Sequence, residues 1–495
     1  MKNIYLIIAL SSFSLNCHAD WLDIVLDATS QLADELFPED VQKSKKLLGD
    51  RLNTYPKHFK LQKVTEPIHN TDLFFLETGS LDKPPILLIH GLGDLATLDW
   101  LNVIPELEKH YHVYAFDLPG FGLSNHHYFE YSPKEYSKII NWFIQNIMPH
   151  SSQKPILIGH SMGAAVSLYY ASYYPNNIAR LVLVSAAGIL ERTSYLKHLS
   201  ELNLGGSQQN NLWLGFNRRI NHFSAKWVEK TGEMYDPSKI LSQNKALRKL
   251  MLARNTNLNA GLALIDTDFS LLNYDNLPPT VMIWGEDDPI APIRTGRALL
   301  GKISQSILTP IFAGGHVPMK SKAAEFNRQL LFLLKMNIEK KEDLKYLLDN
   351  FNKNTNQNRT AQCVNDDITR FEGHYESIIL ENCKKAMLKN VVSKRLFVNH
   401  SIASVENSII GSVSSDIEIY SSRIKATSSQ FLGSIKSKDS RLDFANVKII
   451  ANDFAIDSTR NSTVILSLSE IESPFFHGIA HGYFQLGKEN IENRM

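Results

Sequence analysis

The chain has 495 residues, of which 43% are hydrophobic, and its 52 basic residues nearly balance 51 acidic ones. A chain of this length and composition can bury more than one core, which predicts two or three globular domains. The near-neutral charge gives no reason to expect nucleic acid or an anionic surface as a partner.

The first nineteen residues have the pattern of an export signal. Lys2 precedes an apolar stretch from Ile4 to Leu15, and the segment ends at the small residue Ala19. We therefore expect residues 1–19 to be cleaved and the mature protein to be periplasmic or secreted. The apolar run is shorter than the ~20 residues that cross a bilayer. An acylated Cys17, as in a lipoprotein, is the alternative.

Residues 20–57 are expected to form an amphipathic helical arm, because their apolar residues recur at helical intervals.

From residue 58 to 337, short apolar runs alternate with helical patterns. The runs are Ile86–Ile89, His112–Phe116, Pro155–Ile158, Leu181–Val184 and Val281–Trp284. Continuous apolar runs are typical of strands that are covered on both faces. This region is therefore predicted to be an α/β domain with a mainly parallel sheet, whose functional residues lie where strands end.

A serine lies at one of these strand ends, in the sequence Gly159-His-Ser-Met-Gly163. A strand, a sharp turn with the pattern G-x-S-x-G and a helix together form a nucleophile elbow, in which the turn exposes the Ser161 hydroxyl. A plain strand-to-helix turn is the alternative interpretation. Ser161 is the candidate nucleophile.

A serine hydroxyl needs a base, and the base needs an orienting acid. Downstream, the sequence WGEDDPIAP places Asp288 after the run that ends at Trp284, and GGHVPM places His316 on a glycine turn. The order Ser161, Asp288, His316 is the order expected of such a hydrolase. Asp287 is the alternative acid.

Negative charge that develops during acyl transfer needs hydrogen-bond donors. The sequence His90-Gly-Leu-Gly-Asp94 closes the strand at Ile89. The backbone N–H groups of Leu92 and Met162 are predicted to form the oxyanion hole.

The motifs HGLGD, DLPGFGLS, GHSMG, WGEDDPIAP and GGHVPM, in this order, resemble those of the α/β-hydrolase superfamily, in particular its lid-bearing serine esterases and lipases. The resemblance covers about residues 58–337. It implies an eight-stranded, mostly parallel sheet, with Ser161 as nucleophile, Asp288 as acid and His316 as base. It also implies hydrolysis of carboxylic esters, lipids among them, without cofactor or metal. Serine hydrolases of carbon–carbon or amide bonds remain alternatives.

Residues 189–277 fall where this superfamily inserts a helical lid, and they are rich in Leu and contain Trp213, Phe216, Phe223 and Trp227. An apolar lid above the nucleophile predicts a pocket for an acyl chain. The other interpretation is that these residues only hold the lid to the body.

A polar stretch at residues 338–362 is predicted to be a linker. Residues 363–480 then contain short β-runs rich in Ser and Asn, at Ser377–Asn382, Arg395–Asn399, Asp416–Tyr420 and Arg441–Asn446. Spacings of about 20 to 25 residues suggest stacked coils. We expect a separate all-β module, a short parallel β-helix of four or five coils, with a small β-sandwich as the alternative.

Cys363 and Cys383 are twenty residues apart, about one coil, so they are predicted to form a disulfide between neighbouring coils. The β-module is expected to bind a surface, a polysaccharide or a protein partner. Two function classes result: an exported serine ester hydrolase, or a binding or adhesion protein that uses the hydrolase body as a scaffold.

Overall fold

The computed structural model describes residues 51–93, 95–127, 129–148, 153–190, 256–339, 359–459, 461–477 and 480–486. The predicted signal segment, most of the predicted arm, residues 191–255 of the predicted lid and most of the predicted linker lie outside the described residues. Within the described ranges, no helix is both long and apolar enough to cross a bilayer.

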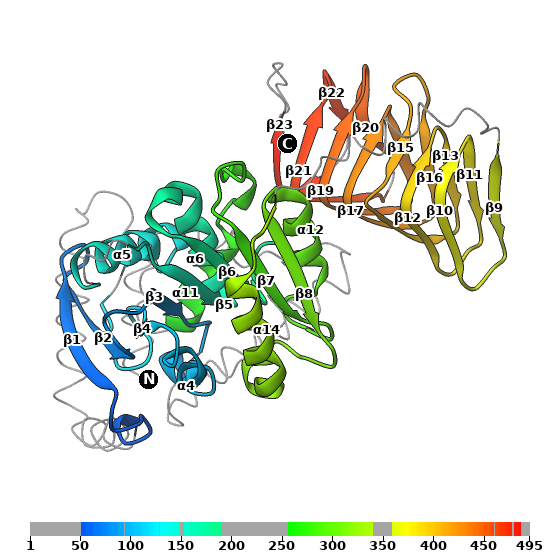
Figure 1. The fold of residues 1–495 in the computed structure, drawn as a ribbon. Helices are drawn as coiled ribbons and strands as arrows, with labels where there is room; N and C mark the ends of the chain where they lie inside the picture. Colours follow the sequence, from blue (N-terminus) through cyan, green and yellow to red (C-terminus); the bar gives the residue numbers. More distant parts are fainter. Residues whose placement is uncertain are drawn as a thin grey trace, which may run out of the picture. The chain divides into compact units, whose positions relative to one another are not determined.

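The first domain is built on one eight-stranded sheet (Figure 1). Its strands are β1 (Lys60–Glu66), β2 (Thr71–Thr78), β3 (Pro85–Ile89), β4 (His112–Phe116), β5 (Ile156–His160), β6 (Arg180–Val184), β7 (Thr280–Gly285) and β8 (Ser306–Ile311), in the order β1-β2-β4-β3-β5-β6-β7-β8. β2 pairs antiparallel with β1 and β4, and the other pairs are parallel. The predicted mainly parallel eight-stranded sheet is confirmed.

Helices cover both faces of this sheet, with α5, α6 and α12 on one side and α4 and α14 on the other (Figure 1). The helices are α4 (Ile104–Leu107), α5 (Pro133–Asn146), α6 (Met162–Tyr173), α11 (Thr256–Ile265), α12 (Arg294–Lys302), α13 (Pro318–Ser321) and α14 (Ala323–Lys335), with 3₁₀ turns η1 (Ala96–Trp100), η2 (Pro175–Asn177) and η3 (Phe269–Leu271). The central strands β3, β4, β5 and β7 are buried along their whole length. Continuous apolar runs form these strands because both faces are covered.

Helix α5 shows how local sequence sets an element of this domain. Ser132 precedes the helix in an extended conformation, and its hydroxyl accepts a hydrogen bond from the Glu135 backbone N–H. Pro133 follows at the first helical position, where its missing N–H costs nothing. The apolar side of the helix buries Ile140 and Phe143 in the core.

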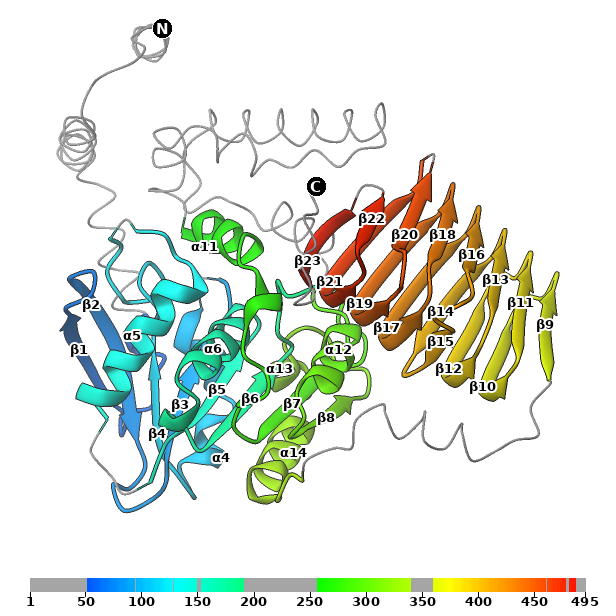
Figure 2. The same ribbon diagram turned by 90° about the horizontal axis from the view of Figure 1, so that it is seen from above.

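The second domain is a stack of parallel β-coils (Figure 2). One sheet contains β9 (Thr360–Val364), β11 (Ser377–Glu381), β13 (Leu396–Asn399), β16 (Ile417–Tyr420), β18 (Ile435–Lys438), β20 (Phe454–Thr459) and β22 (Phe475–His477). The other contains β10 (Thr369–Tyr375), β12 (Ala386–Ser393), β14 (Ile402–Glu406), β15 (Ile409–Gly411), β17 (Arg423–Leu432), β19 (Arg441–Ile450), β21 (Thr463–Glu472) and β23 (Ala480–Leu486). All strand pairs in both sheets are parallel, which confirms the β-helix-like prediction and excludes an antiparallel sandwich.

Two details of the predicted repeat were wrong. The first sheet has seven strands, so the stack is longer than the predicted four or five coils. The run Arg441–Asn446 lies in β19 of the other sheet, and the residue in register with Ile417 is Ile435, eighteen positions away. The spacing gave a wrong repeat because each coil contributes strands to both sheets, and the apolar runs of the two sheets have similar sequences.

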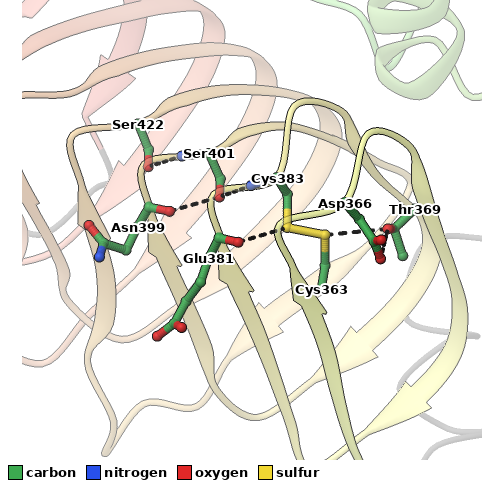
Figure 3. Close-up of a disulfide and its surroundings, with 8 residues drawn as sticks. All are labelled: Cys363, Asp366, Thr369, Glu381, Cys383, Asn399, Ser401 and Ser422. Carbon is green, nitrogen blue, oxygen red and sulfur yellow. Dashed lines mark hydrogen bonds between the residues drawn. A yellow bond between two sulfur atoms is a disulfide. The ribbon is translucent and has the colours of Figure 1, made fainter.

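Four serines of this module, Ser401, Ser422, Ser440 and Ser462, occupy bends between its strands. At one bend, the hydroxyl of Ser401 accepts from the Cys383 N–H, and the hydroxyl of Ser422 accepts from the Ser401 N–H (Figure 3). The ladder continues from Ser422 to Ser440 and then to Ser462. These hydroxyls satisfy backbone donors that the bends would otherwise bury unpaired. These four serines therefore serve coil stacking.

The structure joins Cys363 and Cys383 by a disulfide, with their Cα atoms 6.3 Å apart (Figure 3). The two residues are not at equivalent positions of neighbouring coils, because Cys363 is in register with Leu380. Cys383 lies beyond the end of β11, at the bend where the serine ladder begins. The disulfide thus links the first described coil to the second and caps the serine ladder.

Candidate active site

The nucleophile elbow lies between β5 and α6, at the carboxyl edge of the sheet. Ser161 has φ 52° and ψ −117°, an unusual conformation for a residue with a side chain. Its backbone N–H donates to the carbonyl of Val184, which anchors the turn to β6. This strained turn directs the hydroxyl away from the strand.

The two glycines of the motif allow the backbone to pass closely at this turn. A Cβ atom at Gly159 would stand 2.3 Å from the Gly163 carbonyl oxygen. A Cβ atom at Gly163 would stand 2.3 Å from the His90 carbonyl oxygen. Both distances are far below van der Waals contact, so the elbow requires glycine at both positions.

The three residues predicted as nucleophile, base and acid are in hydrogen-bond contact. Ser161 Oγ lies 2.8 Å from His316 Nε2, and His316 Nδ1 lies 2.8 Å from Asp288 Oδ2. The Asp288 side chain is fully buried and that of His316 is 11% exposed. A carboxylate at Nδ1 keeps the proton on that nitrogen, so Nε2 is free to accept the serine proton.

The acid's loop also distinguishes Asp288 from the alternative, Asp287. The other carboxylate oxygen of Asp288, Oδ1, accepts from the backbone N–H groups of Ile290 and Ala291, both at 2.9 Å. Asp287 is exposed to solvent. The geometry therefore assigns the contact with His316 to Asp288.

The predicted oxyanion donors lie beside the nucleophile. Met162 is the first residue of α6, so its N–H has no acceptor within the helix. Leu92 lies on the loop after β3, and the Cβ of a residue replacing Gly91 would stand 3.0 Å from the Ser161 Cβ. Loop and elbow thus approach each other closely.

His90 orients this loop, a role that the sequence analysis missed. Its Nε2 accepts from the Leu118 N–H at 2.9 Å, so Nδ1 carries the proton and donates to the Gly91 carbonyl at 2.6 Å. In a trans peptide the C=O and N–H groups point in opposite directions. Holding the Gly91 carbonyl against His90 therefore turns the Leu92 N–H away from that ring. The histidine in HGLGD was the signal that could have indicated this role.

His160 supports the loop of the base, which the sequence analysis also missed. Its Nε2 donates to the His316 carbonyl at 2.9 Å, and the residue is only 3% exposed. Burial, followed by the charge of nearby His316, lowers the pKa of His160 to about 4. His160 is therefore neutral at physiological pH and acts as a fixed hydrogen-bond donor.

Within the described ranges, no group of three or more His, Cys, Asp or Glu side chains is arranged to hold a metal ion. The polar groups at the elbow instead form one chain from carboxylate to imidazole to hydroxyl. This arrangement activates a serine for attack on an acyl carbon.

Part of the chain matches a known family and several known proteins. Residues 84–323 match the family described as the alpha/beta hydrolase fold. A pimeloyl-[acyl-carrier protein] methyl ester esterase of Xylella fastidiosa (strain 9a5c) is 26% identical over 254 residues, which are 50% of this chain and 93% of that protein. A monoacylglycerol lipase of Xenopus laevis is 27% identical over 250 residues, 45% of this chain and 66% of that protein. Among solved structures, lip1 of Acinetobacter baumannii AYE, classified as a candidate lipase, has 23% identity and a TM-score of 0.43, and covers 59% of this chain and 95% of its own.

Proposed function

Because residues 84–323 have the α/β-hydrolase fold, we propose that this protein is a serine hydrolase that cleaves carboxylic esters. The observation that carries the proposal is the continuous contact from Asp288 through His316 to Ser161, with both hydrogen bonds at 2.8 Å. A helix N-terminus and a glycine loop beside the hydroxyl supply donors for an oxyanion.

The reaction follows from the proton positions. Ser161 Oγ attacks the ester carbonyl carbon while His316 Nε2 takes the hydroxyl proton, and the carbonyl oxygen becomes an oxyanion near the Leu92 and Met162 amides. Collapse of this intermediate breaks the bond to the alcohol, which leaves with the proton from Nε2. A water then loses its proton to Nε2 and attacks the acyl-enzyme. Nε2 returns that proton to Ser161 Oγ as the acid is released.

The substrate class we propose is an ester with a lipophilic acyl group. Two observations support it: the relatives named as esterase and lipase act on acyl esters, and residues 189–277 are rich in Leu. We further propose that the protein is exported, which its N-terminal apolar segment and the Cys363–Cys383 disulfide support.

A fluorophosphonate probe tests the proposal directly, because it reacts with an activated serine. We expect stoichiometric labelling of the wild-type protein, no labelling of Ser161→Ala, and hydrolysis of p-nitrophenyl esters by the wild type alone. An unlabelled, folded wild-type protein without activity on the ester panel would instead favour the scaffold alternative, a binding or adhesion protein.

A further inference from the structure

The β-module packs directly against helix α12 of the hydrolase domain. The Arg294 guanidinium contacts two strands of the module, β17 and β19. It donates to Thr427 Oγ1 at 2.9 Å, to the Ala426 carbonyl at 2.9 Å, and to Asp443 Oδ1 and the Asp443 carbonyl at 2.8 Å each. The side chains of Arg294 and Asp443 are only 14% and 15% exposed. This ion pair is therefore well shielded from water, unlike an ordinary surface pair.

The last turn of α12 approaches the module even more closely. A Cβ atom at Gly301 would stand 2.3 Å from the Ser428 hydroxyl, so only glycine fits. The same hydroxyl donates to the Arg297 carbonyl at 3.1 Å, and Lys302 forms an ion pair with Glu470 at 2.5 Å. Contacts thus extend along the whole length of the helix.

One row of residues in the module, polar along most of its length, ends in a leucine that packs into the hydrolase core. The row has positive φ at each coil and consists of Asn390, Asn407, Ser428, Asn446 and Leu468. Asparagine tolerates this conformation, whereas leucine rarely adopts it. Leu468 is 1% exposed and packs within the hydrophobic core of the hydrolase domain. A strained, buried leucine in a polar row indicates a fixed contact surface between the domains.

Helix α12 is in turn connected to the catalytic acid through a stiff loop. Asp288 is fixed by the Ile290 and Ala291 N–H groups, and the Ala291 carbonyl accepts from Trp284 Nε1 at 2.6 Å. The Thr295 N–H then donates to the Pro292 carbonyl at 2.8 Å. With prolines at two of its positions, this loop has few ways to adjust. A shift at the first turn of α12 would therefore reach Asp288.

We propose that the β-module is a positioning element of the active site, and that Arg294 is the residue through which it acts. By holding the first turn of α12, the four hydrogen bonds of Arg294 keep the acid loop where Asp288 Oδ2 meets His316 Nδ1. Arg294 contacts neither substrate nor the reacting atoms; it acts through Asp288. The expected change in kcat rests on the proposed ester hydrolysis. The expected change in the Asp288–His316 contact does not.

The kinetic test compares two arginines of the same helix. Arg294→Ala removes the buried contacts, whereas Arg297→Ala removes a more exposed ion pair with Glu406 at 3.3 Å and is the matched control. We expect Arg294→Ala to lower kcat at least tenfold with KM within about twofold of wild type, and Arg297→Ala to change neither. A looser carboxylate stabilises the imidazolium less, so the acid limb of the kcat profile should move to lower pH. Arg294→Lys, which keeps the charge, should be intermediate.

The second readout does not depend on ester hydrolysis. The proton in the His316–Asp288 hydrogen bond should give a far-downfield NMR resonance that is present in wild type and Arg297→Ala, weakened in Arg294→Ala, and absent in His316→Ala. Asp443→Ala, which removes the ion pair but leaves the three other hydrogen bonds of Arg294, should weaken the resonance less than Arg294→Ala does. The proposal is overturned if Arg294→Ala lowers only the melting temperature and leaves kcat, the acid limb and this resonance as in Arg297→Ala. A wild-type protein that shows the resonance but hydrolyses no ester would contradict the proposed function instead.

Discussion

Acidification should destabilise the hydrolase domain through His160. The backbone carbonyl of His316 can only accept, so Nε2 of His160 carries the proton and Nδ1 is the site that titrates. Within the described part of the chain, Nδ1 is buried and has no hydrogen-bond partner. A second proton would therefore place an unpaired charge in the core beside the base.

The magnitude follows from the two pKa values. Burial lowers the pKa of His160 from 6.5 to about 4 in the folded state, so the unfolded chain binds the proton more readily. The stabilising effect is complete above the unfolded value and is lost as the pH falls from about 6.5 toward 4. Linkage gives a loss of about 2.5 kcal/mol in the free energy of unfolding between pH 7.5 and pH 4.5.

Urea unfolding followed by tryptophan fluorescence is the assay, because the tryptophans among the described residues, Trp100, Trp142 and Trp284, all lie in the hydrolase domain. His160→Gln keeps an N–H donor but cannot titrate, so its loss of stability over this pH range should be smaller by about 2.5 kcal/mol. The exposed His110→Gln is the control and should behave as wild type. Burial also lowers the pKa of His126, so some pH dependence remains in every variant. Equal pH dependence of His160→Gln and wild type would refute the reasoning.

Three further predictions concern the acid, the substrate and the disulfide. Asp288→Asn should lower kcat by about 10⁴ because His316 loses its orienting partner, whereas kcat of the exposed Asp287→Asn should stay within about twofold of wild type. Steady-state kinetics on one p-nitrophenyl ester measures both, and the reverse ranking would contradict the assigned acid. If residues 189–277 cover an acyl pocket, kcat/KM should rise with acyl length by about 0.8 kcal/mol for each buried methylene, and a maximum at acetate would argue against such a pocket. Replacing Cys363 and Cys383 by Ser should destabilise the β-module by about 3 kcal/mol, measured by calorimetry. Ester hydrolysis should change little, because β9 and β11 are far along the stack from β17 and β19. An unchanged unfolding transition of the module would show that the disulfide contributes nothing to its stability.

The catalytic chemistry was visible in the sequence because it depends on short segments. A strand, a glycine turn and a helix are local features, and the order Ser161, Asp288, His316 follows from where the buried strands end. The same holds for the α/β class, since continuous apolar runs are sufficient to indicate covered strands. Sequence spacing likewise indicated stacked coils, although the number of coils and the register of Arg441 were wrong.

What the sequence could not determine are contacts between segments far apart in the chain. The bond from His160 to the His316 carbonyl spans 156 positions, and those from Arg294 to Asp443 span 149. Neither has a local signature: a histidine within G-x-S-x-G and an arginine at a helix start are ordinary residues until the fold brings their acceptors close. Leu468 is the same case, an apolar residue in a β-run whose burial partner lies in another domain. Local patterns of polarity and turn residues thus determined the two folds and the reacting groups. Only the tertiary structure decided the packing between domains, because that packing depends on the complementarity of complete surfaces.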